Sequence, residues 1–333
     1  MRFSFFYLLF ILFSNSFINA QLVNTSQEDG LAIKKRILLV ALPEEDKYII
    51  SENQEQPEFL RLYREDLEGQ RKAFQAMILK HWIFTDSIVV LPFKEAKMLM
   101  KKNTDKYAML RYADKTQDQI YKKTNDSIPV ISWVLFNKNY RYDNLTRYDF
   151  RILTVTSLVI ELPKRVIEVS LPKLSPSEGD FIYAIRQMQY ILNNVIVSES
   201  RNAKTLYKEI PLLNDQLKNK ILLLDIHEMD AQEGLRNIEM IKKYYPYPVQ
   251  LVSYTELENI IRSGDTRYAM AVHSRYDFHN STCYVCNAGD GTIYSQFNVP
   301  TFDYGKIDQT QYTIWIYYPC INKLHLETYA GKL

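Results

Sequence analysis

The sequence predicts an α/β protein made of two repeated β-α-β-α-β modules, each with an added antiparallel hairpin. Short apolar runs alternate with segments of helical length, which is the pattern of parallel strands joined by helical crossovers. The same order of runs occurs twice, and Tyr-Ala-Met stands in the third run of each copy, at 107–109 and at 268–270. With 333 residues, of which 47% are hydrophobic, the chain is long enough for two domains with real cores.

Residues 1–20 have the organisation of a secretory signal peptide. A single arginine, Arg2, is followed by an apolar run of about eleven residues and by polar residues that end in the small Ala20. An uncleaved membrane anchor is the alternative, but the run is short for a membrane helix. We expect cleavage near Ala20, a mature chain that starts at Gln21 without a transmembrane segment, and an extracytoplasmic location, periplasmic or secreted.

A polar leader, 21–34, precedes the first module, which we expect over 35–198. Its elements are a strand buried on both faces (35–46), a long helical segment (58–82), a strand (86–92), a helix (94–103), a third strand (106–112), a hairpin around Pro163 and Lys164, and a closing helix. Ser175 and Glu178 have the spacing of a capping box at the start of the closing helix, and Pro176 stands where helices accept proline.

A linker, 199–218, leads to the second module, 219–333. The matching elements are a strand (219–230), a helix (234–245), a strand (248–254), a helix (255–264) and the third strand (267–273). The hairpin that follows turns at Gly289-Asp290-Gly291, a strong turn signal. The end of this module differs from the first, because the segments 313–320 and 323–329 are both expected to be strands.

This order of elements is similar to the small periplasmic α/β modules of the TolB N-terminal and CsgG-like kind. The similarity consists of the β-α-β-α-β core and the hairpin, with the glycine turn at 289–291 in the second copy. It covers the cores of both halves without a specific motif, and the first copy departs from it by lacking the glycine turn. The resemblance implies an envelope assembly or binding role, and no functional residue is carried over from it.

Charge and cysteine content exclude some functions. Lysine and arginine exceed aspartate and glutamate by 41 to 39, so the concentrated basic footprint of a nucleic-acid-binding protein is missing and we expect no nucleic-acid partner. Cys283 and Cys286 lie three apart on an expected strand and point to opposite faces, so they are poorly placed to pair with each other. A disulfide from either one to Cys320, or free thiols, are both open.

Candidate metal ligands follow the first strand of the second module. Ligands of open parallel sheets bind beyond the carboxyl ends of the strands, and Asp225, His227, Glu228 and Asp230 stand at such an end, with His273 at the end of the third strand. Histidine and carboxylate side chains can hold zinc or another divalent ion. The alternative is that the acidic residues stabilise the start of a helix.

The first module does not repeat these residues. Ala41, Pro43, Glu44 and Asp46 align with the second-module loop, and Tyr112 aligns with His273. A duplicated metal site is therefore excluded, although a site in the second module alone is not.

The sequence contains no phosphate-binding glycine loop, no nucleophile elbow and no zinc-protease motif. We therefore assign no catalytic residue and no cofactor, and expect an exported, non-enzymatic binding or assembly protein whose partner is a protein or an envelope component. The alternative is a metal-dependent hydrolase or metal-binding protein that uses the second-module loop. Function should be sought where the copies differ: the long helical segment of the first copy, the loop 114–146 and the C-terminus.

Overall fold

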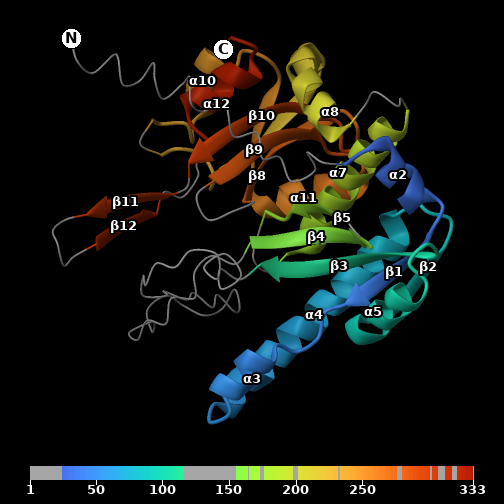
Figure 1. The fold of residues 1–333 in the computed structure, drawn as a ribbon. Coiled ribbons are helices and arrows are strands. Elements are labelled where there is room, and N and C mark those ends of the chain that lie inside the picture. Colours follow the sequence, from blue (N-terminus) through green and yellow to red (C-terminus); the bar gives the residue numbers. More distant parts are fainter. Residues whose placement is uncertain are drawn as a thin grey trace.

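The computed structural model describes residues 25–115, 155–163, 165–172, 176–197, 202–231, 233–275, 280–300, 302–306, 312–316 and 321–332. Within them, two five-stranded mixed sheets combine with helices, so the predicted α/β class is confirmed (Figure 1). Three predictions concern residues outside the described ones: the signal peptide, most of the loop 114–146, and the possible disulfide from Cys283 or Cys286 to Cys320.

The first sheet has the strand order β2-β1-β3-β4-β5. Its strands are β1 (Ile37–Leu42), β2 (Ile88–Pro92), β3 (Tyr107–Lys115), β4 (Val155–Leu162) and β5 (Arg165–Ser170). β1 is parallel to β2 and β3, whereas β3, β4 and β5 pair in antiparallel fashion. The predicted hairpin around Pro163 is thus confirmed as β4 and β5.

The second sheet, β10-β9-β8-β6-β7, has the same topology read from its other edge. Its strands are β6 (Ile221–Asp225), β7 (Val249–Val252), β8 (Tyr268–Arg275), β9 (Asn280–Asn287) and β10 (Ile293–Pro300). Register is repeated too, because Ile37 pairs with Tyr107 in the first sheet and Ile221 pairs with Tyr268 in the second. The repeated Tyr-Ala-Met therefore marks one strand of a duplicated module.

Helices cover both faces of the first sheet because alternate residues of β1 are buried on opposite sides. Leu38 and Val40 pack on the side of α4 (Pro57–His81), and Leu39 and Ala41 on the side of α5 (Phe93–Lys102). A short helix, α3 (Lys47–Glu52), precedes α4, and in Figure 1 it and the start of α4 project beyond the sheet. We call α3 and residues 57–70 of α4 the arm.

The second sheet is covered in the same way. Leu222 and Leu224 pack under α10 (Ile238–Tyr244) and α12 (Lys323–Tyr329), and Leu223 packs toward α11 (Tyr254–Ser263). The prediction of a strand at 323–329 is wrong, because these residues form α12. This segment is a helix because the Asn322 side chain caps it, accepting hydrogen bonds from the backbone N–H groups of the second and third following residues.

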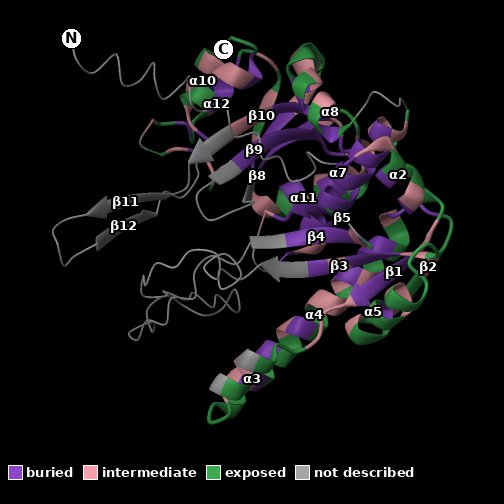
Figure 2. Ribbon diagram, viewed as in Figure 1, coloured by how far each residue is buried: buried purple, intermediate pink, exposed green. Residues whose placement is uncertain are grey.

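A long helix, α7 (Glu178–Ile196), lies between the two sheets, so both modules share one hydrophobic core (Figures 1 and 2). It packs against α4 on one side and α11 on the other. The shared core contains Leu110 of the first sheet and Met270 of the second, and Phe181 and Ile185 of α7 are fully buried in it.

The predicted leader and linker also contain folded segments. α2 (Gln27–Lys34) packs on α7, with Ile33 fully buried and the Gln27 amide donating to Ile196 O at 3.2 Å. Within the linker, α8 (Ala203–Glu209), a 3-10 helix (Ile210–Leu213) and α9 (Asn214–Leu217) follow one another. Leu206 and Tyr207 of α8 belong to the shared core. Both segments therefore help to bury that core.

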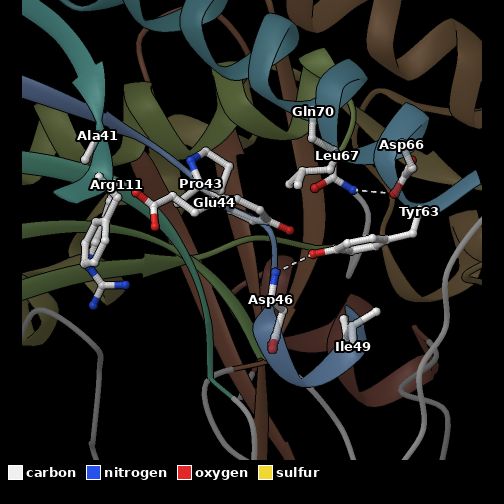
Figure 3. A pocket seen from close by; sticks show the side chains of 12 residues that line it. Ala41, Pro43, Glu44, Asp46, Ile49, Tyr63, Asp66, Leu67, Gln70 and Arg111 are labelled. Atoms are coloured by element: carbon white, nitrogen blue, oxygen red, sulfur yellow. Dashed lines mark hydrogen bonds between the residues drawn. The ribbon is translucent and has the colours of Figure 1, made fainter. Parts of the chain in front are cut away.

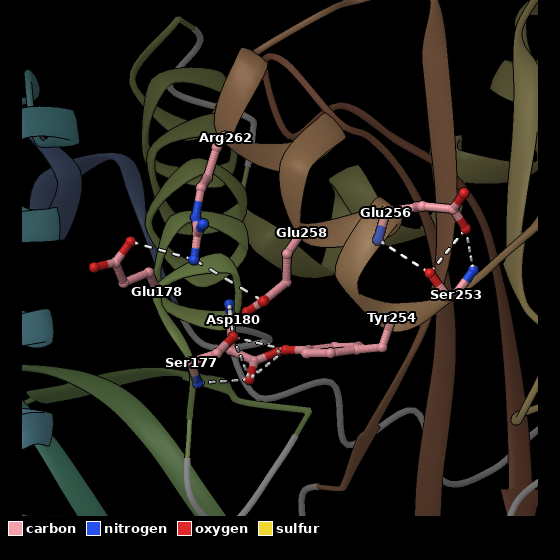
Figure 4. A network of polar contacts seen from close by, with 8 residues as sticks. All are labelled: Ser177, Glu178, Asp180, Ser253, Tyr254, Glu256, Glu258 and Arg262. Carbon is pink, nitrogen blue, oxygen red and sulfur yellow. Dashed lines mark hydrogen bonds and ion pairs between the residues drawn. The ribbon is translucent and has the colours of Figure 1, made fainter.

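Polar contacts tie the start of α7 to α11 (Figure 4). The capping box of α7 is formed by Ser177 and Asp180, so the prediction of Ser175 and Glu178 is wrong by two residues. The Tyr254 hydroxyl at the start of α11 donates to the Asp180 carboxylate at 3.1 Å and lies 2.6 Å from Ser177 Oγ. The residues that cap α7 therefore also bind the start of α11.

The glycine turn of the second module also reaches α7. The Arg186 guanidinium donates to Ile261 O at 2.6 Å and to Ala288 O, which joins α7 to the end of α11 and to the turn. Gly291 has φ +78°, and a Cβ atom there would lie 2.5 Å from the carbonyl carbon of Arg186. Glycine is needed at this position for both reasons.

The remaining findings concern the cysteines and the C-terminal strands. Cys283 and Cys286 lie in cores on opposite faces of β9, as predicted, and within the described residues both are buried free thiols. β11 (Phe302–Lys306) and β12 (Tyr312–Ile316) form a separate antiparallel pair, and β12 overlaps the strand predicted at 313–320 over residues 313–316. None of the helices in the described part of the chain has the length and apolar character that a membrane span requires.

Candidate functional site

The carboxyl ends of the parallel strands are built differently in the two modules. In the first module, the turn after β1 is held by the side chains of α4. The Arg71 guanidinium donates to Pro43 O at 2.7 Å, and the Asp46 backbone N–H donates to the Tyr63 hydroxyl at 2.7 Å. The long helix α4 thereby fixes the turn after β1.

Ion pairs hold the same turn on both sides. Arg64 of α4 lies 3.0 Å from a carboxylate oxygen of Glu45, and Lys94 of α5 lies 3.1 Å from one of Glu44. All four side chains are substantially solvent-exposed, so each pair contributes little stability and mainly sets where the side chains lie.

A cavity of about 290 Å³ opens at this place, between the turn, α4, the start of α5 and the end of β3 (Figure 3). Its apolar lining comes from Ile49, Tyr63, Leu67, Phe93 and Tyr112. Its polar lining comes from Glu44, Asp46, Asp66, Gln70 and Arg111. We call this cavity the first-module pocket.

Figure 3 shows the Tyr63 ring reaching from α4 toward the turn, with Gln70 and Asp66 beside it. The Gln70 amide donates to Asp66 Oδ2 at 2.8 Å, and this bond orients the carboxylate along the pocket wall. Arg111 pairs with Glu161 of the neighbouring strand β4. The pocket thus combines aromatic surface with charged groups that the scaffold holds in place.

The second module brings together only some of the predicted metal ligands. Glu228 Oε2 lies 3.3 Å from His273 Nδ1, and this pair bridges the turn after β6 and the end of β8. Asp225 instead accepts a hydrogen bond from the backbone N–H of His227 at 2.9 Å, a local turn contact, and the His227 side chain is exposed. Within the described residues, no group of three or more His, Cys, Asp or Glu side chains is arranged to hold a metal ion.

His273 is buried on the face of the second sheet that α12 covers. Burial disfavours its charged form, but Cys283 on the neighbouring strand and the Glu228 carboxylate outweigh burial and raise the pKa of His273 to about 10. Tyr329 of α12 donates its hydroxyl proton to Cys283 Sγ at 2.9 Å. These side chains form a polar cluster beneath α12, in which the Glu228 side chain stays partly exposed.

His325 of α12 belongs to the same cluster, and sequence reasoning missed it. Its side chain is fully buried, and its ring centroid lies 5.8 Å from that of His273. Burial, followed by the charge on His273, lowers the pKa of His325 to about 3. The signal that could have found it is Asn322, a favoured N-cap residue three positions earlier.

The histidine pair takes the place of an aromatic pair in the first module. Tyr112, the equivalent of His273, packs edge-on against Phe181 of α7 with ring centroids 5.8 Å apart. The rings of His273 and His325 meet at 5.8 Å and 76° in the second module. α12 thus covers its sheet as α7 covers the first, and the pair contributes packing at this position.

The turn of the second module is closed by the chain itself. Ile321 N donates to Glu228 O at 2.7 Å, and Asp230 N donates to Ile321 O at 3.0 Å, so Ile321 lies alongside the turn as a short bridge to Met229. In the first module, the N–H group equivalent to that of Asp230 is bonded by the Tyr63 hydroxyl. The same backbone N–H group is thus bonded by a main-chain segment in the second module and by a tyrosine side chain in the first.

No family model, no curated protein and no solved structure matches the chain. The resemblance to TolB N-terminal and CsgG-like modules therefore stays a prediction.

Proposed function

We propose that this chain is an exported, non-enzymatic binding or assembly protein of the cell envelope, which holds a protein or envelope component at the first-module pocket. The difference between the equivalent strand ends carries the proposal. One end is an open pocket walled by the arm, and the other is covered by α12 and bridged by Ile321.

The scaffold supports binding rather than chemistry at these ends. It is duplicated in topology and register, whereas the polar residues at its strand ends are not duplicated. A helix of 25 residues, α4, walls the pocket, where the second module has the seven-residue α10. Ligand sites of α/β sheets lie at such strand ends, so the added helix provides a partner surface there.

A pair of matched variants tests the proposal. Gln70→Trp places a large ring in the pocket, and Lys72→Trp places the same ring on the exposed surface of the same helix. Tagged protein is recovered from the cells that produce it after chemical cross-linking, and partners are quantified by mass spectrometry. We expect a partner that the wild type and Lys72→Trp capture equally and that Gln70→Trp loses. Equal capture by all three proteins would contradict the proposal.

A metal-dependent hydrolase or metal-binding protein is the second candidate. The observation that favours it is that Nε2 of both His273 and His325 is buried without a hydrogen-bond partner among the described residues. Stoichiometric metal in the purified protein, lost in a His227→Ala, His273→Ala double variant, would support it. Metal content and activity that are unchanged in that variant would rule it out.

A further inference from the structure

The edge strands of the two five-stranded sheets are not equally protected. Proteins guard exposed edge strands with charged residues, with proline or by covering them, because an open edge pairs with further strands. β5 carries Arg165 and Glu168, β7 is only four residues long and contains Gln250, and β10 packs against the 3-10 helix and α9. β2 differs from these three strands, since Ile88-Val89-Val90-Leu91 is entirely apolar and proline comes only at its end (Figure 1).

The backbone of β2 turns one row of polar groups away from the sheet. Leu38 N donates to Ser87 O, and Leu38 is in register with Ile88, so residues 87, 89 and 91 bond with β1. The N–H and C=O groups of Ile88 and Val90 therefore point outward, and within the described residues no further segment bonds with them. Such a row of donors and acceptors can bind an added strand.

Apolar side chains around this edge are exposed as well. Val89 is 40% exposed, and Met98 of α5, which packs beside β2, is 61% exposed. Val89 is in register with Leu39, so it lies on the face of the sheet that α5 covers. Among the described residues, nine large apolar side chains are exposed, and four of them fall within 79–98: Leu79, Ile83, Val89 and Met98. Apolar surface is thus concentrated in the segments that adjoin β2, and its burial favours association.

The charges at the two ends of β2 indicate which partner fits this edge. Asp86 stands exposed just before the strand, and Lys94 and Lys97 stand exposed in α5 directly after it. Lys94 pairs with Glu44 but keeps 71% of its side chain exposed, and Asp86 has no ion pair among the described residues. In an antiparallel pair of two copies, the start of one β2 lies beside the end of the other, which brings Asp86 of each copy near the lysines of its counterpart. The edge is therefore complementary in charge to a second copy of itself.

We propose that β2 pairs antiparallel with β2 of a second copy, which joins the two first sheets into one continuous sheet of a two-fold dimer. Full overlap of the strand Ile88–Pro92 places Val90 opposite Val90 of the other copy, where the backbone N–H of each donates to the carbonyl oxygen of the other. Ile88 N donates in turn to Pro92 O of the other copy, and the ladder ends there because Pro92 has no N–H group. Val89 then lies opposite Leu91 of the other copy, which covers it.

Sedimentation velocity tests the proposal on the protein purified from the cells that produce it. We expect a reversible dimer with a Kd below about 100 µM. Val89→Lys places a positive charge on this edge and against the α5 lysines of the other copy, so it should weaken the dimer at least about tenfold. The matched control Val166→Lys makes the same change on β5, the opposite edge of the same sheet, where Val166 is 60% exposed, and should leave the dimer unchanged.

A disulfide tests the register and does not require that Val89→Lys folds. Val90→Cys places two thiols opposite each other across the two-fold axis, and the Cα atoms of such a hydrogen-bonded pair lie about 5.5 Å apart, within the range of disulfides. Diamide, which oxidises two thiols to a disulfide and takes up their hydrogen atoms, should link this variant into a covalent dimer on a non-reducing gel. Val166→Cys under the same conditions should stay a single chain, which controls for the native cysteines.

Three outcomes would overturn the inference. A protein that stays monomeric at about 200 µM would leave this edge to a strand of another protein. Equal effects of Val89→Lys and Val166→Lys would place the dimer contact elsewhere. Val90→Cys protein that cross-links no more than Val166→Cys protein would contradict the register.

The inference goes beyond the proposed function, and the two fail separately. A monomeric protein leaves partner capture at the first-module pocket untouched. Equal partner capture by Gln70→Trp and the wild type leaves the dimer untouched.

Discussion

Acid should destabilise this protein through His325 in particular. This imidazole is fully buried among Phe297, Tyr329 and His273, and its pKa is lowered to about 3 from an ordinary value of 6.5. The unfolded chain takes up a proton at this side chain below about pH 6.5, whereas the folded chain does not until about pH 3. The stability that the neutral ring contributes is therefore present above pH 6.5 and is lost as the pH falls toward 3.

The size of the effect follows from the two pKa values. At about pH 5, the unfolded chain is favoured by about 2 kcal/mol through this one group, and at about pH 7.5 by almost nothing. A His325→Phe variant keeps a ring beside Phe297 and removes the titration. The variant loses the contact between Nδ1 and Asn322 Oδ1, a cost that applies to both pH values.

Urea unfolding of both proteins at the two pH values measures the effect, with a chelator and a reductant present. His273, Glu228, Cys283 and Tyr329 remain in both proteins, so their titration largely cancels in the comparison. We expect the stability of the wild type, relative to the variant, to fall by about 2 kcal/mol between about pH 7.5 and about pH 5. Parallel pH profiles would refute the assignment of a buried neutral histidine.

Three further predictions concern the fold and export. Gly291→Ala should lower the free energy of unfolding by about 2 kcal/mol or more, because the positive φ and the Arg186 backbone both oppose a side chain. Gly234 has a similar φ but open space around it, so Gly234→Ala should lower the free energy of unfolding by about 1 kcal/mol. Equal losses in urea unfolding would contradict the close approach of Gly291 to α7. Phe74→Ala should cost about 3–5 kcal/mol in the same assay, since this ring is fully buried against Phe181, and a loss below about 1 kcal/mol would contradict the shared core. Intact mass of the exported protein should place its first residue at Gln21, and a retained leader would contradict the predicted signal peptide.

The duplicated strands were predictable because their signal is local. Each buried strand is a short apolar run, and the equivalent runs keep their order and their register. The glycine turn was predictable for the same reason, since Gly289-Asp290-Gly291 is a turn signal by itself. The position of α7 between the sheets was not, because its stripe at Ile182 and Ile185 gives one buried face and does not reveal a second sheet.

Where the sequence was misread, two local interpretations competed. The segment 323–329 alternates apolar and polar residues in part, and only the Asn322 cap and the packing of Leu326 and Tyr329 make it a helix. Ser175 with Glu178 and Ser177 with Asp180 both have capping-box spacing, and the contact with Tyr254 is available to the second pair. Tertiary contacts contributed to both cases, together with the local Asn322 cap in the first.

The first-module pocket could be predicted only in part. The sequence indicates that ligands bind after β1 and β3, and it places Tyr63 and Leu67 on one stripe of a helix. It does not indicate that the Tyr63 hydroxyl bonds with the Asp46 backbone, which brings the arm over the strand ends. Asp225 and His227 are suitable metal ligands by residue type. In the structure, however, Asp225 bonds with the His227 backbone in a local turn, whereas Glu228 contacts His273.

Site-specific photo-cross-linking tests the central claim most directly. A photoreactive amino acid is placed at Ile49, which lines the first-module pocket, and in a second protein at His227, which is exposed on the equivalent turn of the second module. Both proteins are irradiated in the cells that produce them, and adducts are identified by mass spectrometry. We predict a partner adduct at Ile49 and none at His227. An adduct at His227 without one at Ile49 would contradict the account.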